Sequence, residues 1–559
     1  MNICKAAIRH FTMMKRNLDM MQFKGKSVYK GIALGPVMVL KGREEQVKCR
    51  EIEDEEAEIE MLKSAIAQAQ AQLQKVYDQA LQKIGESGSA IFKVHQMMLE
   101  AEDYWSAIHD RIRTEKVNAA YAVAVTGDSV AAMFDKMEDE YMRARAADIK
   151  DISGRLIHIL EGNRDIDWSS VEPSIIVADD LSPSETVQMD REKILALVTV
   201  HGSPNSHSAI LARMMNIPAL VGIPMNLDEV HTGMLAVVDG FRGEVTFEPD
   251  EALCADARAR SRKEEKTRRL LESLKGKESV TADGRKISLY ANVGSLGDID
   301  YALQNDAEGI GLFRSEFLYL GREGFPTEEE QFQVYKQAAQ MMAGKQVVIR
   351  TLDIGADKQA DAFALGREEN PAMGYRGIRI CLKQPDIFKT QLRALWRAAA
   401  FGDIAILYPM ITSVEEVQKI YEIVQAMEKE LEAAGIFYKR PEQGIMIETP
   451  AAVMVSDELA QLVDFFSIGT NDLTQYTLAM DRQNGRLDEF YDPHHKAVLR
   501  MIRMIVENAH KHGKRVGICG ELGADLELTE KFIRMGVDEL SVVPSMILQI
   551  RKAVREMNA

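Results

Sequence analysis

The chain has 559 residues, enough for two to four domains, and its 46% hydrophobic and 28% charged residues are typical of a globular protein. Its formal net charge of −17 argues against a nucleic-acid partner, and no apolar run approaches the roughly 18 residues needed to cross a membrane. The five cysteines include no Cys-x-x-Cys pair, which argues against a zinc site or a disulfide framework. We therefore expect a cytoplasmic protein without membrane insertion.

The first part of the chain combines short strand-like runs with a long helical region. Residues 1–20 are basic but lack the apolar core of a signal peptide, so we expect a non-functional N-terminal extension translated from an upstream start codon. Residues 28–40 are predicted to form two short strands around Gly31 and the Gly35-Pro36 pair. Between residues 44 and 164, apolar residues recur every three or four positions, which predicts four helices with a turn at 85–88 after the first. These helices are either a structural insertion or a docking surface for another protein.

A Gly-Ser-Pro loop follows the buried strand predicted at 194–200 and leads into a helix, which places His207 in the first helical turn. Free backbone N–H groups and the helix dipole favour anions at this position and oppose protonation of the ring. A neutral imidazole there is a candidate nucleophile whose phosphorylated form would be stabilised. The alternative is a surface or capping histidine.

A charged stretch over residues 251–275 predicts a linker helix, and a regular alternation of strands and helices follows it. Eight apolar runs separated by helical stretches predict a (β/α)₈ barrel of ordinary size. The expected strands are 287–292, 309–313, 347–351, 404–408, 444–447, 465–468, 516–519 and 539–543.

The active site of such a barrel lies at the carboxyl ends of its strands. The residues expected at this rim are Asn292, Arg314, Glu316, Arg350, Asp353, Pro409, Glu448, Asn471, Asp472, Cys519 and Glu521. Glu448 and Asp472 can hold a magnesium ion together with substrate oxygens and water. Arg314, Arg350 and Arg376 suit bidentate binding of phosphate and carboxylate groups. Alternatively, some of these charges form salt bridges of the barrel.

Cys519 ends the seventh strand-like run and can donate or accept a proton, because an ordinary thiol pKa of about 8.5 is close to neutral pH. We expect nearby arginines and the cation to lower this pKa. The other cysteines, Cys4, Cys49, Cys254 and Cys381, are expected to lie away from the rim. An inert Cys519 is the alternative.

Six long motifs extend this pattern along the chain. They are Gly309–Leu318, Arg350–Gly355, Asn370–Arg376, Glu448–Ala451, Phe466–Tyr476 and Cys519–Leu522. In sequence and order they resemble enzyme I of the bacterial phosphoenolpyruvate:sugar phosphotransferase system. The resemblance extends from about residue 25 to the end of the chain.

The resemblance implies a multidomain α/β fold. Its parts are a phosphohistidine α/β domain (21–43 and 165–250), an inserted helical subdomain that binds the carrier protein HPr (44–164), a linker helix (251–276) and a C-terminal TIM barrel (277–559). In this family the barrel binds phosphoenolpyruvate and forms a homodimer. The implied reaction transfers the phosphoryl group of phosphoenolpyruvate to a histidine of the enzyme and then to HPr, with release of pyruvate.

The same resemblance implies residue roles. His207 is the histidine phosphorylated on its ring nitrogen, and Cys519 is the acid that protonates the enolate of pyruvate. Glu448 and Asp472 match the ligands of Mg²⁺. The residues expected to bind phosphoenolpyruvate are Arg314, Arg350, Asn471 and Arg482, to which the chemistry of its side chain adds Arg376.

One motif departs from the family. Its usual loop is Gly-Gly-Arg-Thr-Ser-His, and this chain has Gly-Ser-Pro-Asn-Ser-His at 202–207. Ser206 and His207 are kept, whereas Pro204 and Asn205 replace the arginine and the threonine. Asn205 can still donate a hydrogen bond, and the upstream His201 is either a substitute contact or without a role.

Two other functions fit parts of the pattern. Pyruvate phosphate dikinase and phosphoenolpyruvate synthase share the mobile histidine and the barrel, but they need an ATP-grasp domain. Here about 170 residues, mostly helical and without a Gly-rich nucleotide loop, occupy that place. A regulatory protein that only senses phosphoenolpyruvate is the second alternative, and the complete set of arginines, carboxylates and thiol at the rim argues against it.

Overall fold

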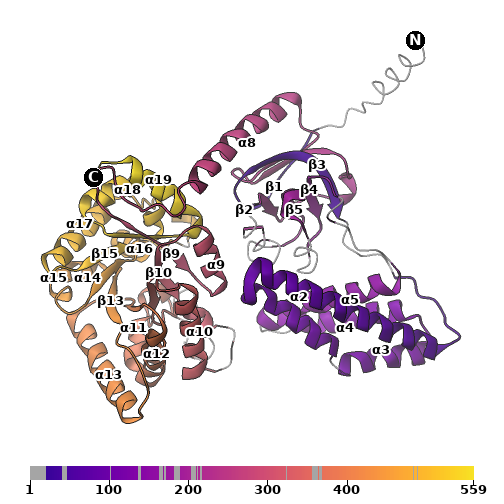
Figure 1. Cartoon of the computed structure of the whole chain (residues 1–559), viewed down its shortest axis with the longest axis horizontal. Coiled ribbons are helices and arrows are strands. Elements are labelled where there is room, and N and C mark those ends of the chain that lie inside the picture. Colours follow the sequence, from indigo (N-terminus) through magenta and orange to yellow (C-terminus); the bar gives the residue numbers. More distant parts are fainter. Residues whose placement is uncertain are drawn as a thin grey trace. The chain divides into compact units, whose positions relative to one another are not determined.

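The computed structural model contains two compact units, Met1–Arg269 and Leu270–Ala559 (Figure 1). It describes residues 20–40, 47–100, 102–135, 140–162, 171–181, 189–202, 217–320, 324–355, 368–482, 484–487 and 489–558, with Trp168, Ala209, Ala212, Arg213, Arg322 and Phe363. In this part of the chain, no helix is both long and apolar enough to span a membrane.

An eight-stranded mixed sheet organises the α/β part of the first unit, with the strand order β1-β8-β7-β3-β4-β5-β6-β2 among the described residues. Its strands are β1 (Met21–Lys24), β2 (Lys26–Tyr29), β3 (Ile32–Leu40), β4 (Ser174–Ala178), β5 (Ile194–Thr199), β6 (Ala219–Val221), β7 (Leu235–Asp239) and β8 (Glu244–Phe247). The short helices η1 (Arg191–Lys193) and η2 (Leu227–Glu229) precede β5 and β7. Strand β3 pairs parallel with β4 and antiparallel with β7, so it joins the two halves of the sheet.

The two strands expected within 28–40 are β2 and β3, which are separated at Gly31, but the expected break at Gly35 and Pro36 is wrong. Strand β3 continues through Gly35 and Pro36. The proline removes one backbone donor, but the next residue, Val37, donates to the carbonyl of Met234 at 2.7 Å. One missing donor therefore leaves the strand intact.

Four helices form the inserted part of the first unit: α2 (Glu55–Glu100), α3 (Glu102–Glu115), α4 (Ala119–Asp135) and α5 (Glu140–Leu160). The predicted turn at 85–88 is wrong, because α2 runs through it and ends only at Glu100. Glycine costs about 1 kcal/mol relative to alanine inside a helix. Leu73 and Phe92, on either side of this segment, are buried in one apolar core, and this packing outweighs the poor helix propensity.

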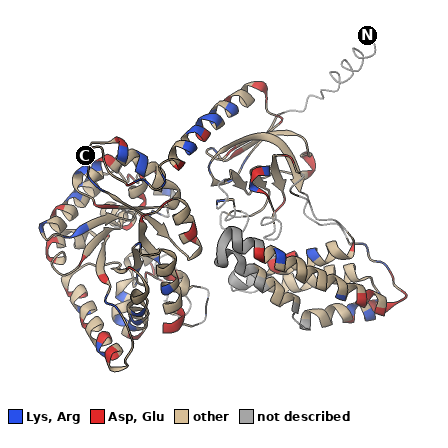
Figure 2. Ribbon diagram, viewed as in Figure 1, with Lys and Arg blue, Asp and Glu red and all other residues tan. Residues whose placement is uncertain are grey.

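Helix α8 (Glu251–Glu272) follows the sheet and carries alternating basic and acidic side chains (Figure 2). Its first half buries Cys254 and Ala257. Arg260 Nη1 lies 2.7 Å from Asp239 Oδ2, at the end of β7, and Glu264 accepts a hydrogen bond from the backbone N–H of Ile32 at 3.1 Å. These contacts attach α8 to the α/β sheet of its own unit.

A closed barrel of eight parallel strands forms the second unit, which confirms the predicted (β/α)₈ fold. Its strands are β9 (Ser288–Val293), β10 (Gly309–Arg314), β11 (Val347–Arg350), β12 (Ile404–Tyr408), β13 (Glu442–Ile447), β14 (Phe465–Ile468), β15 (Arg515–Ile518) and β16 (Glu539–Val542). Its helices are α9 (Gly297–Gln304), α10 (Glu328–Met341), α11 (Ile378–Lys383), α12 (Pro385–Ala398), α13 (Val414–Ala433), α14 (Pro450–Met454), α15 (Ser456–Leu459), α16 (Thr470–Leu478), α17 (Lys496–Lys511), α18 (Leu526–Met535) and α19 (Ile547–Glu556). Short 3₁₀ helices are η3 (Glu316–Leu318), η5 (Pro371–Met373), η6 (Ala399–Phe401), η7 (Gly485–Leu487), η8 (Glu521–Ala524) and η9 (Pro544–Met546).

Two apolar layers hold the barrel together. The larger one lies between strands and helices, where the alternate residues of each strand meet the buried faces of the helices. The smaller cluster contains Leu312, Val348, Ala405, Leu407, Met446, Phe465 and Cys519. Side chains of this cluster come from neighbouring strands, so they fill the barrel interior and support the polar residues at its carboxyl end.

Candidate active site

The ends of the barrel strands bring the predicted rim residues together. Arg314 ends β10 and Arg350 ends β11, and the two are direct partners in the register of these parallel strands. Glu448 follows β13 immediately, and Asp472 lies in the first turn of α16, just after β14. Parallel strands end at one edge of the barrel, so residues far apart in the sequence share one site.

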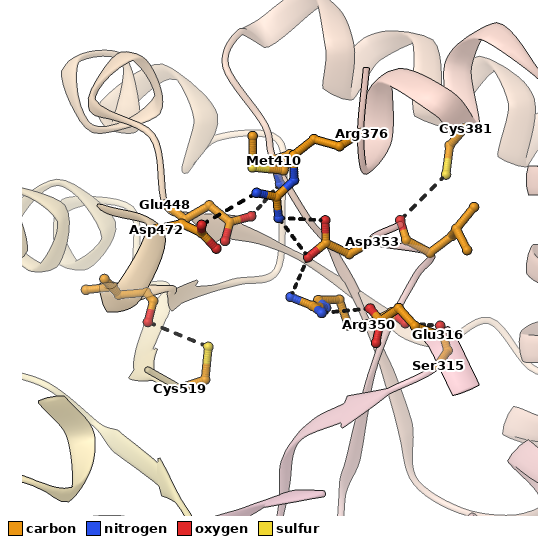
Figure 3. A network of polar contacts seen from close by, with 12 residues as sticks. Ser315, Glu316, Arg350, Asp353, Arg376, Cys381, Met410, Glu448, Asp472 and Cys519 are labelled. Carbon is orange, nitrogen blue, oxygen red and sulfur yellow. Dashed lines mark hydrogen bonds and ion pairs between the residues drawn. The ribbon is translucent and has the colours of Figure 1, made fainter. Parts of the chain in front are cut away.

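Alternating charges connect this site in a continuous network (Figure 3). Arg350 Nη2 donates to Glu316 Oε1 at 2.7 Å, and its Nη1 lies 2.8 Å from Asp353 Oδ2. Arg376 Nη2 donates to both oxygens of Asp353, at 3.1 and 3.2 Å. Arg376 Nη1 lies 3.5 Å from Asp472 Oδ1. The expected salt bridges are therefore present, and they involve two of the arginines that were predicted to bind substrate.

Both guanidinium groups keep their charge although they are buried. Burial disfavours the charged form, but Asp353 and Glu316 raise the pKa of Arg350, and Asp353 and Asp472 raise that of Arg376. The Nε atoms of both arginines are buried without a hydrogen-bond partner among the described residues. An unsatisfied buried donor costs about 1–3 kcal/mol, which an anionic ligand would recover.

Glu448 is buried against this network. Its Oε1 accepts a hydrogen bond from the backbone N–H of Met410 at 2.6 Å. Burial and the neighbouring carboxylates of Asp472 and Asp353 raise its pKa above the usual range, while the arginines act in the opposite direction. Gly469 makes room for this side chain, because a Cβ atom there would lie 2.8 Å from Glu448 Oε2.

The carboxylates of Glu448 and Asp472 fit a magnesium ion. A divalent cation prefers oxygen ligands and would remove the repulsion that opposes ionisation of Glu448. Within the described ranges, no group of three or more His, Cys, Asp or Glu side chains is arranged to hold a metal. Two carboxylates completed by substrate oxygens and water match the usual ligand set of Mg²⁺.

Cys519 lies directly after β15 and is buried, with Sγ 3.6 Å from the carbonyl oxygen of Ile468. The pKa of its thiol is raised to about 11, mainly by burial and to a lesser extent by Glu448, whereas Ser467 and Arg350 act in the opposite direction. Arg350 therefore acts in the expected direction, but the pKa of the thiol is raised overall, because the loss of hydration outweighs this attraction. A raised pKa favours the protonated thiol at neutral pH, and a thiol in this form can donate a proton.

Of the remaining predicted substrate residues, Arg314 ends β10, Asn471 lies in α16, and Arg482 follows α16 by four positions. Asn471 Nδ2 donates to Glu521 Oε1 at 3.0 Å, and the backbone N–H of Glu521 donates to Asn471 Oδ1 at 2.9 Å. Arg314 and Arg482 are exposed. Arg482 lines a hollow together with Asp481, Asn484, Leu487 and Tyr491.

His207 lies outside the described residues, as do Pro204 and Asn205, so its predicted role stays a prediction. Ala209 and Ala212, which follow it, are helical and buried, in keeping with the predicted helix. His201 Nδ1 lies 3.0 Å from Asp179 Oδ1.

Sequence reasoning placed Glu316 and Asp353 at the rim but gave them no role, and it did not single out Tyr476. The tyrosine accepts a hydrogen bond from Arg376 Nη1 at 3.3 Å and donates to the carbonyl of Ala372. The signal for the two acids was present in the sequence, since each follows a rim arginine by two or three positions. Tyr476 carries no comparable signal.

Three family descriptions match the chain. They are "PEP-utilising enzyme, N-terminal" over residues 24–145, "PEP-utilising enzyme, mobile domain" over 171–243 and "PEP-utilising enzyme, PEP-binding domain" over 268–559. The last of these covers the whole barrel.

Curated relatives match nearly the full chain. Phosphoenolpyruvate-protein phosphotransferase of Staphylococcus carnosus (strain TM300) is 39% identical over 96% of this chain and 94% of its own length. The Haemophilus influenzae enzyme of that name (strain ATCC 51907 / DSM 11121 / KW20 / Rd) is 41% identical over 94% and 92%. A solution NMR structure of Enzyme I is 31% identical over 44% of this chain and 99% of its own, with a TM-score of 0.38. The chain therefore belongs to the PEP-utilising enzymes, within the family of the phosphoenolpyruvate-protein phosphotransferases.

Proposed function

We propose that this phosphoenolpyruvate-protein phosphotransferase phosphorylates its own His207 and passes the phosphoryl group to HPr, as the general enzyme of a sugar phosphotransferase system. The observation that carries the substrate assignment is the pair of buried guanidiniums at the barrel mouth. Their Nε donors are unpartnered among the described residues, and the carboxylates of Glu448 and Asp472 lie close enough to interact with Arg376. Such a site suits a small ligand with several negative charges and an accompanying cation.

Phosphoenolpyruvate offers a phosphate and a carboxylate to this site. Arg350 and Arg376 bind these groups from the buried side, and the exposed Arg314 and Arg482 bind from the opening. Asn471 contributes its amide. Glu448 and Asp472 hold Mg²⁺, which, when bound, supplies Lewis-acid polarisation of the substrate's anionic oxygens.

The transfer is a displacement at phosphorus. A ring nitrogen of His207 attacks, the bond between phosphorus and the enol oxygen breaks, and its electron pair stays on that oxygen. The methylene carbon of the enolate then takes the thiol proton of Cys519, which gives pyruvate. The phosphorylated ring loses one proton to solvent, and the thiolate regains one, so the protons balance.

The resemblance supports the remaining parts of the proposal. HPr binds the helical subdomain, 44–164, and the barrel, 277–559, forms a homodimer. The strongly acidic composition favours a partner with a basic surface. A reducing cytoplasm suits the free cysteines Cys49, Cys254, Cys381 and Cys519.

A phosphorylation assay tests this function. Incubation with labelled phosphoenolpyruvate and Mg²⁺ should give acid-labile, base-stable phosphate on the wild-type chain, which HPr then removes. His207→Ala should remain unlabelled while it still binds phosphoenolpyruvate, and a chelator should suppress labelling of the wild-type chain. Substantial acid-labile phosphate on His207→Ala would contradict the assignment of the nucleophile, and labelling by ATP in place of phosphoenolpyruvate would favour the dikinase group.

A further inference from the structure

Asp353 is the one carboxylate among the described residues that bonds to both Arg350 and Arg376. It contacts Arg350 Nη1 at 2.8 Å and Arg376 Nη2 at 3.1 and 3.2 Å, and it is buried. We propose that Asp353 is the positioning residue of the substrate site, because its carboxylate orients both guanidiniums toward phosphoenolpyruvate. This inference rests on the proposed function and adds a role that does not involve contact with the substrate.

The other partners of the two arginines cannot replace this contact. Glu316 contacts Arg350, at 2.7 Å, and no ion pair between Glu316 and Arg376 is found among the described residues. Arg376 has Tyr476 at 3.3 Å and Asp472 at 3.5 Å, both on its Nη1 side. Without Asp353, the attraction of Asp472 and Glu448 would therefore draw Arg376 toward the carboxylate pair. Asp353 supplies the opposing attraction that keeps Arg376 beside Arg350.

The backbone around Asp353 is shaped for this contact. Gly377 has φ of +57°, and a Cβ atom there would lie 3.1 Å from Asp353 Oδ1. Gly355 has φ of +112°, and a Cβ atom there would lie 2.4 Å from Arg376 Cβ. Both positive φ values favour glycine, so the chain after β11 can close tightly onto the ion pairs. A longer acidic side chain at position 353 would press against this closely packed backbone.

Asp353 also determines how selective the site is. It neutralises part of the positive charge of the two arginines while it fixes their directions. A ligand must then match the geometry of the remaining donors, because charge alone attracts it less strongly. Loss of the Asp353 carboxylate should have two opposite effects on ligand binding. The two guanidiniums would no longer be held in the direction that phosphoenolpyruvate needs, but the positive potential of the site would increase and attract any anion more strongly. A general collapse of the site would instead weaken the binding of every anion.

Titration calorimetry on the full-length chain separates these effects. His207→Ala, present in every sample, prevents turnover, and the ligands are phosphoenolpyruvate with Mg²⁺ and inorganic phosphate alone. Adding Asp353→Asn should weaken phosphoenolpyruvate binding at least about tenfold, the effect of 1.4 kcal/mol, while phosphate binds equally well or more tightly. Glu442→Gln is the matched control, because it breaks an arginine–carboxylate pair with Arg515 near the amino ends of the strands and should change neither affinity.

A second variant keeps the test informative if Asp353→Asn folds poorly. Asp353→Glu retains the charge but adds a methylene group, so it should weaken phosphoenolpyruvate binding without a gain in phosphate binding. Unchanged phosphoenolpyruvate affinity in both variants, or equal weakening for both ligands in Asp353→Asn, overturns the inference. Failure of the wild-type chain to label His207 would instead refute the proposed function, because the calorimetric comparison does not require transfer.

Discussion

At the scale of single residues, Cys519 shows that burial and charge compete for control of one proton. Burial raises its pKa to about 11, although Arg350 acts in the opposite direction. The protonated thiol lies under the barrel mouth, where the enolate would form. Its environment therefore suits a group that donates a proton and regains it between turnovers.

We predict that Cys519→Ala retains phosphoenolpyruvate and metal binding but loses most turnover, by about 10²–10⁴-fold. It should also lose the exchange of pyruvate methyl protons with deuterated solvent, because the same group must remove a proton in the reverse direction. NMR of pyruvate in deuterium oxide with enzyme and Mg²⁺ measures this exchange. Cys49→Ser, an exposed cysteine of the other unit, is the control and should exchange normally. Exchange at the wild-type rate in Cys519→Ala would identify another group as the acid.

The sequence predicted the positions of the rim residues better than their partners. Arg350 and Glu448 come at or directly after the end of a strand, and strand ends follow from apolar periodicity. The pairing of Asp353 with Arg376 joins residues 23 positions apart, so it depends on tertiary structure and not on local sequence. The direction of the Cys519 pKa shift depends on burial in the barrel interior, and sequence spacing does not report burial of a single side chain.

At the scale of secondary-structure elements, the link between β14 and α16 determines the space available to Glu448. Gly469 has φ of −83°, so alanine could adopt this backbone without strain. Its Cβ atom, however, would lie 2.8 Å from Glu448 Oε2 and 2.9 Å from Glu448 Cβ. Glycine is therefore needed at position 469 to leave space for the side chain of Glu448, and not to allow the backbone conformation of the link.

Gly469→Ala should therefore displace Glu448 and reduce phosphoryl transfer from phosphoenolpyruvate by roughly tenfold or more, while the barrel stays folded. The metal concentration for half-maximal activity should rise, since Glu448 is a proposed ligand. Initial rates against Mg²⁺ concentration, with circular dichroism as a check of folding, measure both effects. Gly324→Ala is the control, because a Cβ atom there meets no atom within 4 Å. An unchanged Mg²⁺ dependence in Gly469→Ala would exclude Glu448 as a ligand or show that the loop adjusts.

The sequence-based prediction of helices and strands was wrong where tertiary packing outweighed the local tendency of glycine and proline to interrupt an element. Helix α2 crosses the glycines at 85 and 88, and β3 crosses Gly35 and Pro36. In both elements the apolar faces continue on either side of the interruption and are buried in one core. The eight barrel strands were predictable because each is a short apolar run bounded by polar loops, with no competing periodicity.

At the scale of the whole molecule, the chain forms two compact units, and the proposed function uses both of them. The proposed nucleophile belongs to the first unit, and the substrate network belongs to the second. Each unit has its own apolar core, and Arg260 and Glu264 attach α8 to the first unit. A cut after residue 276 therefore preserves these contacts, whereas a cut near residue 250 would remove them.

We predict that a fragment of residues 21–276 exchanges phosphate with phosphorylated HPr but takes none from phosphoenolpyruvate. The first reaction needs only His207 and the helical subdomain, while the second needs the arginines and carboxylates of the barrel. Labelled phospho-HPr and labelled phosphoenolpyruvate, offered separately to the fragment and to the full chain, measure the two reactions. The full chain should accept phosphate from both donors, which controls for the quality of the reagents. Phosphorylation of the fragment by phosphoenolpyruvate would show that the first unit holds a substrate site of its own, and the division of labour would be wrong.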